Sequence, residues 1–229
     1  MQPTGTWPLT SMKYTRRFIA YTSLALLAAC AAIGTGGEFA AGRRALLGND
    51  PETALGYFLA AAQRDPNYVF IGSNFKQGIW SYVGRTQYLT KRYKEAIESL
   101  DRALAKDPNE YMAQLYRGLT LARSGDLSGG VKDIQAANKG IFDFLEYMER
   151  ARPFYAIWDP LRAMRKSIDN DLKKIDGKDF NPEELMANAE WLGKTMENEI
   201  DRVRQDERRQ FERDFDRRGG SSVGAGIGF

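Results

Sequence analysis

The chain of 229 residues is 43% apolar and 28% charged, a composition that excludes a disordered protein and allows one or two domains with a hydrophobic core. It holds no histidine and one cysteine, Cys30, which excludes Ser-His and Cys-His nucleophiles, histidine-ligated or multi-cysteine metal sites, and an intrachain disulfide. The formal net charge of +3 arises within residues 1–30, where Lys13, Arg16 and Arg17 stand without an acid, and the other 30 basic residues balance 30 acidic ones, so we expect no nucleic-acid partner.

Residues 1–29 have the features of an export signal. From Met12, which is an alternative start, the cationic MKYTRRF precedes the apolar IAYTSLALLAA and then Cys30. An apolar helix of about 11 residues covers only ~17 Å, against ~30 Å for the hydrocarbon core of a bilayer, so this stretch is too short for a permanent transmembrane helix. Leu27-Ala28-Ala29-Cys30 resembles the bacterial lipoprotein box.

That resemblance implies that Cys30 receives a diacylglycerol and becomes the first residue after cleavage. Residues 30–34 would then be a lipidated tether, and Ala31, in place of an aspartate, implies sorting to the outer membrane with the chain facing the periplasm. A triacylated terminus anchors a protein stably. Two alternatives stay open: an ordinary secretory signal whose cysteine is a coincidence, and an uncleaved apolar anchor.

A pattern of small and apolar residues then occurs three times. In residues 77–110, Trp80 is followed by Gly84, Ala96, Leu100, Ala103 and Pro108. The same spacings recur upstream at Gly42, Ala54, Phe58, Ala61 and Pro66, and downstream at Gly118, Gly130, Ile134 and Ala137. These residue types at these spacings resemble the tetratricopeptide repeat (TPR), and the alternative is a helical hairpin with no repeat relationship.

The resemblance implies an all-α, TPR-like solenoid of antiparallel helix pairs. We expect three repeats, at 35–68, 77–110 and 111–144, in which the small residues let paired helices approach closely. Pro108 cannot continue a helix and so ends the second repeat. The eight residues 69–76, VFIGSNFK, are an insertion that either lengthens a helix or forms a loop.

Helical periodicity continues beyond the repeats. Between Pro153 and Pro160 lies an aromatic cluster, and an apolar face then follows at Leu161, Met164, Ile168, Leu172 and Ile175. The cluster consists of Phe154, Tyr155, Ile157 and Trp158. An open stack of repeats needs a cover for its last face, so we expect residues 145–176 to form capping helices.

A long charged helix is predicted over residues 181–218, about 55 Å in length. Asn181 supplies an N-cap, and Pro182, Glu183 and Glu184 suit the first turn. The second half interleaves opposite charges, pairing Arg202 with Asp206, Arg209 with Glu212, and Arg213 with Asp216. We interpret it as a solvated helix, with a partner-docking arm that uses Phe211 and Phe215 as the alternative, and residues 219–229 as a flexible Gly-rich tail.

Resemblance to the TPR family also implies where a ligand would bind. The first helix of each repeat lines the concave surface, which directs Arg43, Arg85, Tyr88, Leu119 and Arg123 toward the groove. Arginines in equivalent positions favour an acidic or carboxylate-ended segment of a protein partner. The alternative is that these arginines pair with neighbours such as Glu38 or Glu95.

No catalytic, metal or cofactor site is recognisable in the sequence, so we expect a noncatalytic protein-interaction adaptor. The lipoprotein-box resemblance implies a membrane anchor, and the architecture resembles that of lipoproteins that assist pilus, secretin and barrel assembly, so we expect a membrane-anchored lipoprotein that assists assembly of an envelope complex. A permanent accessory subunit of a larger secretion, pilus or respiratory complex is the alternative, and an enzyme that uses paired carboxylates is a remote one. The sequence does not name the partner or the oligomeric state.

Overall fold

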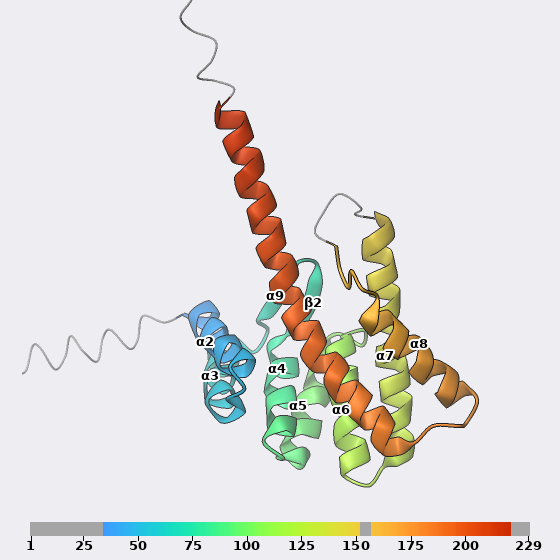
Figure 1. Ribbon diagram of the computed structural model, residues 1–229. Coiled ribbons are helices and arrows are strands. Elements are labelled where there is room, and N and C mark those ends of the chain that lie inside the picture. Colours follow the sequence, from blue (N-terminus) through green and yellow to red (C-terminus); the bar gives the residue numbers. More distant parts are fainter. Residues whose placement is uncertain (1–33, 152–156, 221–229) are drawn as a thin grey trace, which may run out of the picture.

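The computed structural model describes residues 34–151 and 157–220, so the leader with Cys30, the positions Phe154 and Tyr155, and residues 221–229 lie outside the described part. The chain folds as the predicted all-α, TPR-like solenoid, with three antiparallel helix pairs followed by two further helices (Figure 1). The pairs are α2 (Thr35–Leu47) with α3 (Pro51–Arg64), α4 (Ile79–Leu89) with α5 (Tyr93–Lys106), and α6 (Tyr111–Arg123) with α7 (Leu127–Ala151).

The helices of each pair approach closely because glycines stand at the contact positions that the repeat pattern identifies. A Cβ atom added to Gly118 would lie 2.7 Å from the carbonyl oxygen of Gly130 on the partner helix, and one added to Gly42 would lie 2.7 Å from the ring of Phe58. A Cβ atom on Gly84 would collide with the side chain of Leu100. These contacts leave no room for a side chain.

The first two pairs end in the same way. After α3 the N–H of Asn67 donates to Oδ1 of Asp65 at 2.9 Å, and after α5 the N–H of Asn109 donates to Oδ1 of Asp107 at 3.1 Å. A proline stands between the two partners in both turns, and its ring cannot continue the helix. The third pair lacks this proline, and α7 continues to Ala151.

The predicted boundary between repeats and capping helices at residue 144 is therefore wrong. Residues 145–151 belong to α7, which buries Leu145 and Met148 on the same side as the rest of its core face. The cap is α8 (Ala163–Asp176), which packs against α7. Its buried side chains include Met164, Ile168 and Ile175.

The prediction that Leu161 shares the buried face of α8 is also wrong, since Leu161 is 82% exposed. It precedes the helix, and Arg162 at the N-cap has a left-handed backbone with φ of 54°, which takes Leu161 out of helical register. Of the predicted aromatic cluster, Trp158 is buried against Phe75 and Phe144, whereas Ile157 is exposed.

The insertion at 69–76 is neither a lengthened helix nor a loop. It is an antiparallel hairpin of β1 (Val69–Gly72) and β2 (Phe75–Gly78), in which Val69 pairs with Gly78 and Gly72 with Phe75. Ser73 and Asn74 at the turn both have positive φ, as a tight two-residue hairpin turn requires. The inward positions of β2 bury Phe75 and Gln77 and leave Lys76 exposed.

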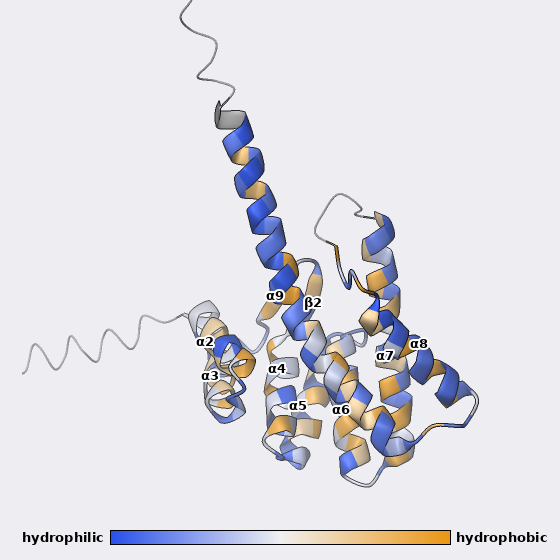
Figure 2. Cartoon of the chain, in the orientation of Figure 1, coloured by the Kyte–Doolittle hydropathy of each residue, from blue (hydrophilic) through white to orange (hydrophobic). Residues whose placement is uncertain are grey.

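The last helix, α9 (Pro182–Gly220), begins as predicted, because Oδ1 of Asn181 accepts a hydrogen bond of 3.0 Å from the N–H of Glu184. It crosses the repeats, contacting α6, α8 and β1, and then projects beyond the body (Figure 1). The crossing half buries Leu185, Leu192, Met196, Ile200 and Val203. The projecting half is almost entirely hydrophilic (Figure 2).

Alanine substitutions at a crowded and at an uncrowded glycine test the close contact between α4 and α5. The substitution Gly84→Ala places a methyl group against Leu100 and should lower the free energy of unfolding by about 1–3 kcal/mol. The same change at Gly56, which has no atom within 4 Å of the added Cβ, should instead raise it by about 0.5–1 kcal/mol. Urea titration of both variants measures these shifts, and a similar stabilisation of both would show that α4 and α5 do not depend on this contact.

A buried carboxyl joins the hairpin to the start of α6. Oε1 of Glu110 accepts a hydrogen bond of 2.7 Å from the N–H of Gly78, and the Glu110 side chain lies in the interior. Burial raises the pKa of Glu110 from 4.5 to about 7, although hydrogen bonds from Gly78 and Ser81 act in the opposite direction. The folded state therefore favours the neutral carboxyl.

Because the pKa of Glu110 is higher in the folded state, its contribution to stability is complete below pH 4.5 and is lost as the pH rises through 7. Glu110→Gln removes this titration. The free energy of unfolding of the variant, relative to that of the native protein, should therefore rise by about 2–3 kcal/mol from pH 5 to pH 8. Chemical unfolding at both pH values checks this. Parallel pH profiles of the two proteins would contradict the burial of an ionisable Glu110.

Candidate functional site

A buried ionic cluster lies where α9 crosses the first helices of the first two repeats. Glu197 of α9 accepts hydrogen bonds from Nε of Arg43 on α2 at 2.6 Å and from Nη1 of Arg85 on α4 at 2.9 Å. The hydroxyl of Tyr82 donates to the same carboxylate at 3.2 Å, and Nη1 of Arg43 also binds Asp201 at 2.9 Å. Arg43 is 6% exposed, Arg85 4% and Glu197 1%.

The pKa shifts in this cluster favour the charged arginines and a neutral tyrosine. Burial by itself lowers the pKa of Arg43 and Arg85, yet Glu197 and its neighbours together raise it more, so both pKa values lie above the ordinary value. Burial, followed by the charge of Glu197, raises the pKa of the Tyr82 hydroxyl well above its usual range. Tyr82 therefore remains a hydrogen-bond donor to the carboxylate.

These contacts correct the expectation that Arg43 and Arg85 face an open groove. Both arginines point toward α9, and the acidic group that they bind belongs to this helix of the same chain. The alternative of pairing with Glu38 or Glu95 is not what is found either, since Glu38 pairs with Arg64 at 2.8 Å. The contact between α9 and the repeats fills this part of the groove.

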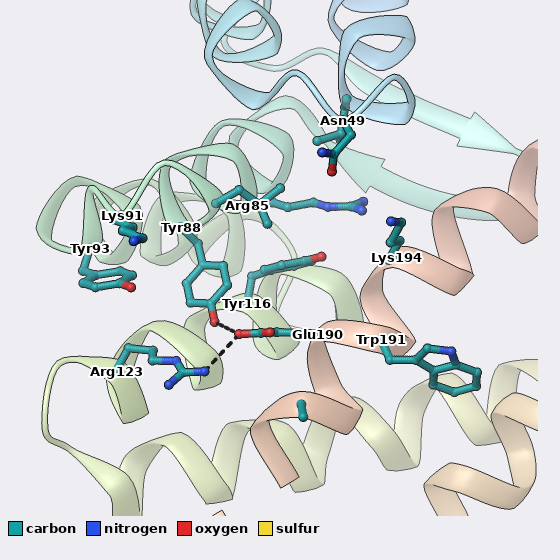
Figure 3. A pocket seen from close by; sticks show the side chains of 13 residues that line it. Asn49, Arg85, Tyr88, Lys91, Tyr93, Tyr116, Arg123, Glu190, Trp191 and Lys194 are labelled. Atoms are coloured by element: carbon teal, nitrogen blue, oxygen red, sulfur yellow. Dashed lines mark hydrogen bonds and ion pairs between the residues drawn. The ribbon is translucent and has the colours of Figure 1, made fainter. Parts of the chain in front are cut away.

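An open cavity of about 660 Å³ remains beside α9, and it gathers three of the residues predicted to bind a partner (Figure 3). Arg85 and Tyr88 reach it from α4 and Arg123 from α6. Tyr88 and Arg123 converge on Glu190 of α9, the tyrosine by a short hydrogen bond and the arginine at 3.3 Å (Figure 3). Arg43 does not line this cavity, and Leu119 lies fully buried in the core.

The cavity combines aromatic walls with basic side chains. Its rings come from Tyr88, Tyr93, Tyr116 and Trp191, and its cations from Arg85, Lys91, Arg123 and Lys194 (Figure 3). Within the described residues the two arginines have carboxylate partners, while Lys91 and Lys194 form no ion pair within 4.0 Å. With Glu190 as its one acidic lining residue, the cavity suits an anion that also carries an apolar or aromatic group.

Several residues of this cavity cannot be predicted from local sequence patterns. Trp191, Lys194 and Glu190 belong to a helix whose position in the groove no local pattern indicates. Tyr116 is different, since it precedes Gly118 by two residues just as Tyr82 precedes Gly84. That equivalence would have identified two inward tyrosines, and Tyr116 reaches α9 because Gly193 has no side chain to block its hydroxyl.

The projecting half of α9 carries Phe211 and Phe215, which are 71% and 69% exposed. Their spacing of four residues places both rings on one side of the helix. Of the predicted ion pairs, Arg202 does bind Asp206, at 2.7 Å. Those of Arg209 with Glu212 and Arg213 with Asp216 do not occur among the side chains that the structure describes.

In residues 34–151 and 157–220, no group of three or more acidic or thiol ligands is placed to hold a metal ion. No helix in these two ranges is both long and apolar enough to span a bilayer.

Comparison with known proteins identifies one repeat. Residues 78–110 match the family model described as Tetratricopeptide repeat, and this segment contains all of α4 and α5. No curated protein and no solved structure matches the chain significantly. The match supports a TPR protein through its middle helix pair, and the outer two pairs follow from their spacing and from the fold.

The buried cluster should be among the most sensitive positions of the fold. Glu197→Gln leaves the buried Arg85 without a counter-charge and Arg43 with Asp201 alone, and should lower the free energy of unfolding by about 3–5 kcal/mol. Glu212→Gln, an exposed change on the same helix, should stay within about 0.5 kcal/mol of the native protein. Urea unfolding measures both, and amide exchange should rise in α9 before it rises in α4 and α5. Native stability in the Glu197 variant would contradict a structural role for the cluster.

Proposed function

We propose that the protein is a noncatalytic adaptor of the bacterial cell envelope, lipid-anchored through Cys30, which binds an acidic segment of a partner protein in the cavity beside α9. The tetratricopeptide match supports a role in protein–protein interaction. The observation that carries the proposal is the convergence of Arg85, Tyr88 and Arg123 with two lysines in one open cavity. The lipoprotein-box resemblance of the leader supports the anchor and the periplasmic location, with Ala31 favouring the outer membrane.

The chemistry of the cavity favours a short acidic segment that includes an apolar or aromatic residue. The ammonium groups of Lys91 and Lys194, which form no ion pair among the described residues, can attract carboxylates, and the accessible rings of Tyr93 and Trp191 offer stacking surface. A volume of about 660 Å³ admits a few side chains and not a folded domain. The partner would therefore present a terminus or an extended loop.

A permanent accessory subunit is the second candidate function, and the exposed Phe211 and Phe215 favour it. Two large rings on a charged, projecting helix are suited to lasting contact with another protein. A permanent subunit copurifies in fixed stoichiometry with a larger secretion, pilus or respiratory complex. An assembly adaptor is substoichiometric, and the finished complex survives its removal.

The test of partner binding uses the two free lysines, because substitutions at Arg43 and Arg85 would disturb the packing of α9 as well. Lys91→Gln with Lys194→Gln should reduce capture of the partner from gently solubilised envelopes roughly tenfold, the loss of two screened charge contacts. Lys94→Gln with Lys139→Gln makes the same charge change on exposed positions outside the cavity and should leave capture unchanged. Quantitative mass spectrometry of the captured proteins gives the readout.

Undiminished capture by the Lys91 and Lys194 variant, at native helicity by circular dichroism, would refute the cavity as the binding site. The mass spectra of the captured material also contain the N-terminal peptide of the mature protein. A terminus that begins at Cys30 and carries acyl chains supports the anchor, and a cleaved but unacylated terminus overturns it.

A further inference from the structure

A second concavity, of about 380 Å³, lies between α2 and the part of α9 that leaves the body. Its wall includes the first turn of α2 at Gly36, the rings of Tyr68 and Phe70, and a group of arginines. The exposed arginines are Arg44 on α2 and Arg208 on α9, with the half-exposed Arg204 between them. It is distinct from the cavity of Figure 3, with which it shares no lining residue.

The charge of this concavity is not balanced by the described residues around it. Asp201 is its one acidic lining residue, and that carboxylate already binds Arg43 at 2.9 Å. Arg204 reaches the same carboxylate only at 3.8 Å. Arg44 and Arg208 form no ion pair within 4.0 Å in the part of the chain that the structure describes. Three guanidinium groups therefore line one concavity, two of them without an ion pair among the described residues and the third with a long one.

The shape of these groups favours a phosphate. Guanidinium presents a planar fork of N–H donors that matches two oxygens of a phosphate at once. Arg204 is held in place because its guanidinium lies over the ring of Phe70, 5.3 Å from the centroid. The hydroxyl of Tyr68, which lies beside Gly36, adds a further polar group at the edge.

The position of the concavity in the chain indicates where the phosphate comes from. Gly36 stands six residues after Cys30, and six extended residues span at most ~20 Å. A chain anchored at Cys30 therefore holds this concavity close to the membrane surface, at a high effective concentration of lipid headgroups. Anionic headgroups also attract basic side chains near the surface.

We propose that Arg44, Arg204 and Arg208 bind the phosphate of an anionic lipid headgroup in the membrane that holds the protein, and so fix the orientation of the solenoid. This inference rests on the proposed anchoring through Cys30. The ligand class is a phosphodiester headgroup without a balancing cation, such as that of phosphatidylglycerol.

Arginine modification tests the proposal on the full-length protein. The protein is reconstituted into vesicles of phosphatidylcholine alone, or of phosphatidylcholine with phosphatidylglycerol, and treated with phenylglyoxal, and the rate of modification at each arginine is read by mass spectrometry. Phosphatidylglycerol should slow modification of Arg44 and Arg208 about threefold or more, which corresponds to occupancy of about two thirds. Arg213, exposed on the opposite side of α9, serves as the internal control and should keep its rate.

Two further measurements distinguish a lipid headgroup from free phosphate and test whether the arginines belong to one site. Inorganic phosphate added to phosphatidylcholine vesicles should give no comparable protection, and Arg44→Gln should weaken the protection of Arg208 whereas Arg213→Gln should not. The lipid site would be overturned if free phosphate protected these arginines as well as phosphatidylglycerol does. It would also be overturned if their modification rates were equal in vesicles with and without phosphatidylglycerol. The N-terminal peptide of the same digest reports acylation of Cys30, so failure of the anchor is distinguished from failure of the headgroup site.

Discussion

The carboxylate of Glu197 fixes how the last helix lies on the repeats. It binds arginines from the first and the second helix pair, and all three charged groups are buried, so a misplaced Glu197 would leave buried charges without partners. A shift of α9 by one residue rotates each side chain by about 100°, so the ionic contact also sets the register of the whole helix. Glu190 and Lys194 precede Glu197 by seven and three residues, and Arg204 and Arg208 follow it by seven and eleven. One buried cluster thus places the residues of both concavities along the same stripe of α9.

This arrangement changes how a ligand can use the concave face. In an open stack of helix pairs the concave face is free, whereas here α9 lies against the first helices of the pairs and supplies an acidic side chain to Arg43 and Arg85. The cavity of Figure 3 is bounded on one side by the repeats and on the other by Glu190, Trp191 and Lys194 of α9. Recognition would therefore depend on two surfaces that the chain itself holds together. The arginines at the base of the groove are part of the fold.

The sequence predicts the helix pairs well because their signals are local. The spacing from Gly84 to Ala96 and the Asn181-Pro182 start each act within a few turns of helix. The position of α9 leaves no such signal, since the contacts of Glu197 with Arg43 and Arg85 join residues 154 and 112 positions apart. The hairpin leaves a weak signal, because Ser73-Asn74 follows the strand-forming run VFIG but precedes FKQG, in which Phe75 is the one large apolar residue. The extension of α7 follows from the missing proline, because a repeat without its closing proline has nothing to end its second helix.

The two concavities are far enough apart to act independently. Along α9, Lys194 of the first cavity and the midpoint between Arg204 and Arg208 of the second are about 12 residues apart, or ~18 Å. This is roughly twice the Debye length of ~8 Å at physiological ionic strength, so an anionic surface at the arginines would repel an acidic segment at the lysines only weakly. The rigid helix between them, held by Glu197, would keep that separation constant. The proposed headgroup site and the proposed partner cavity can thus share one charged helix without competing for the same anion.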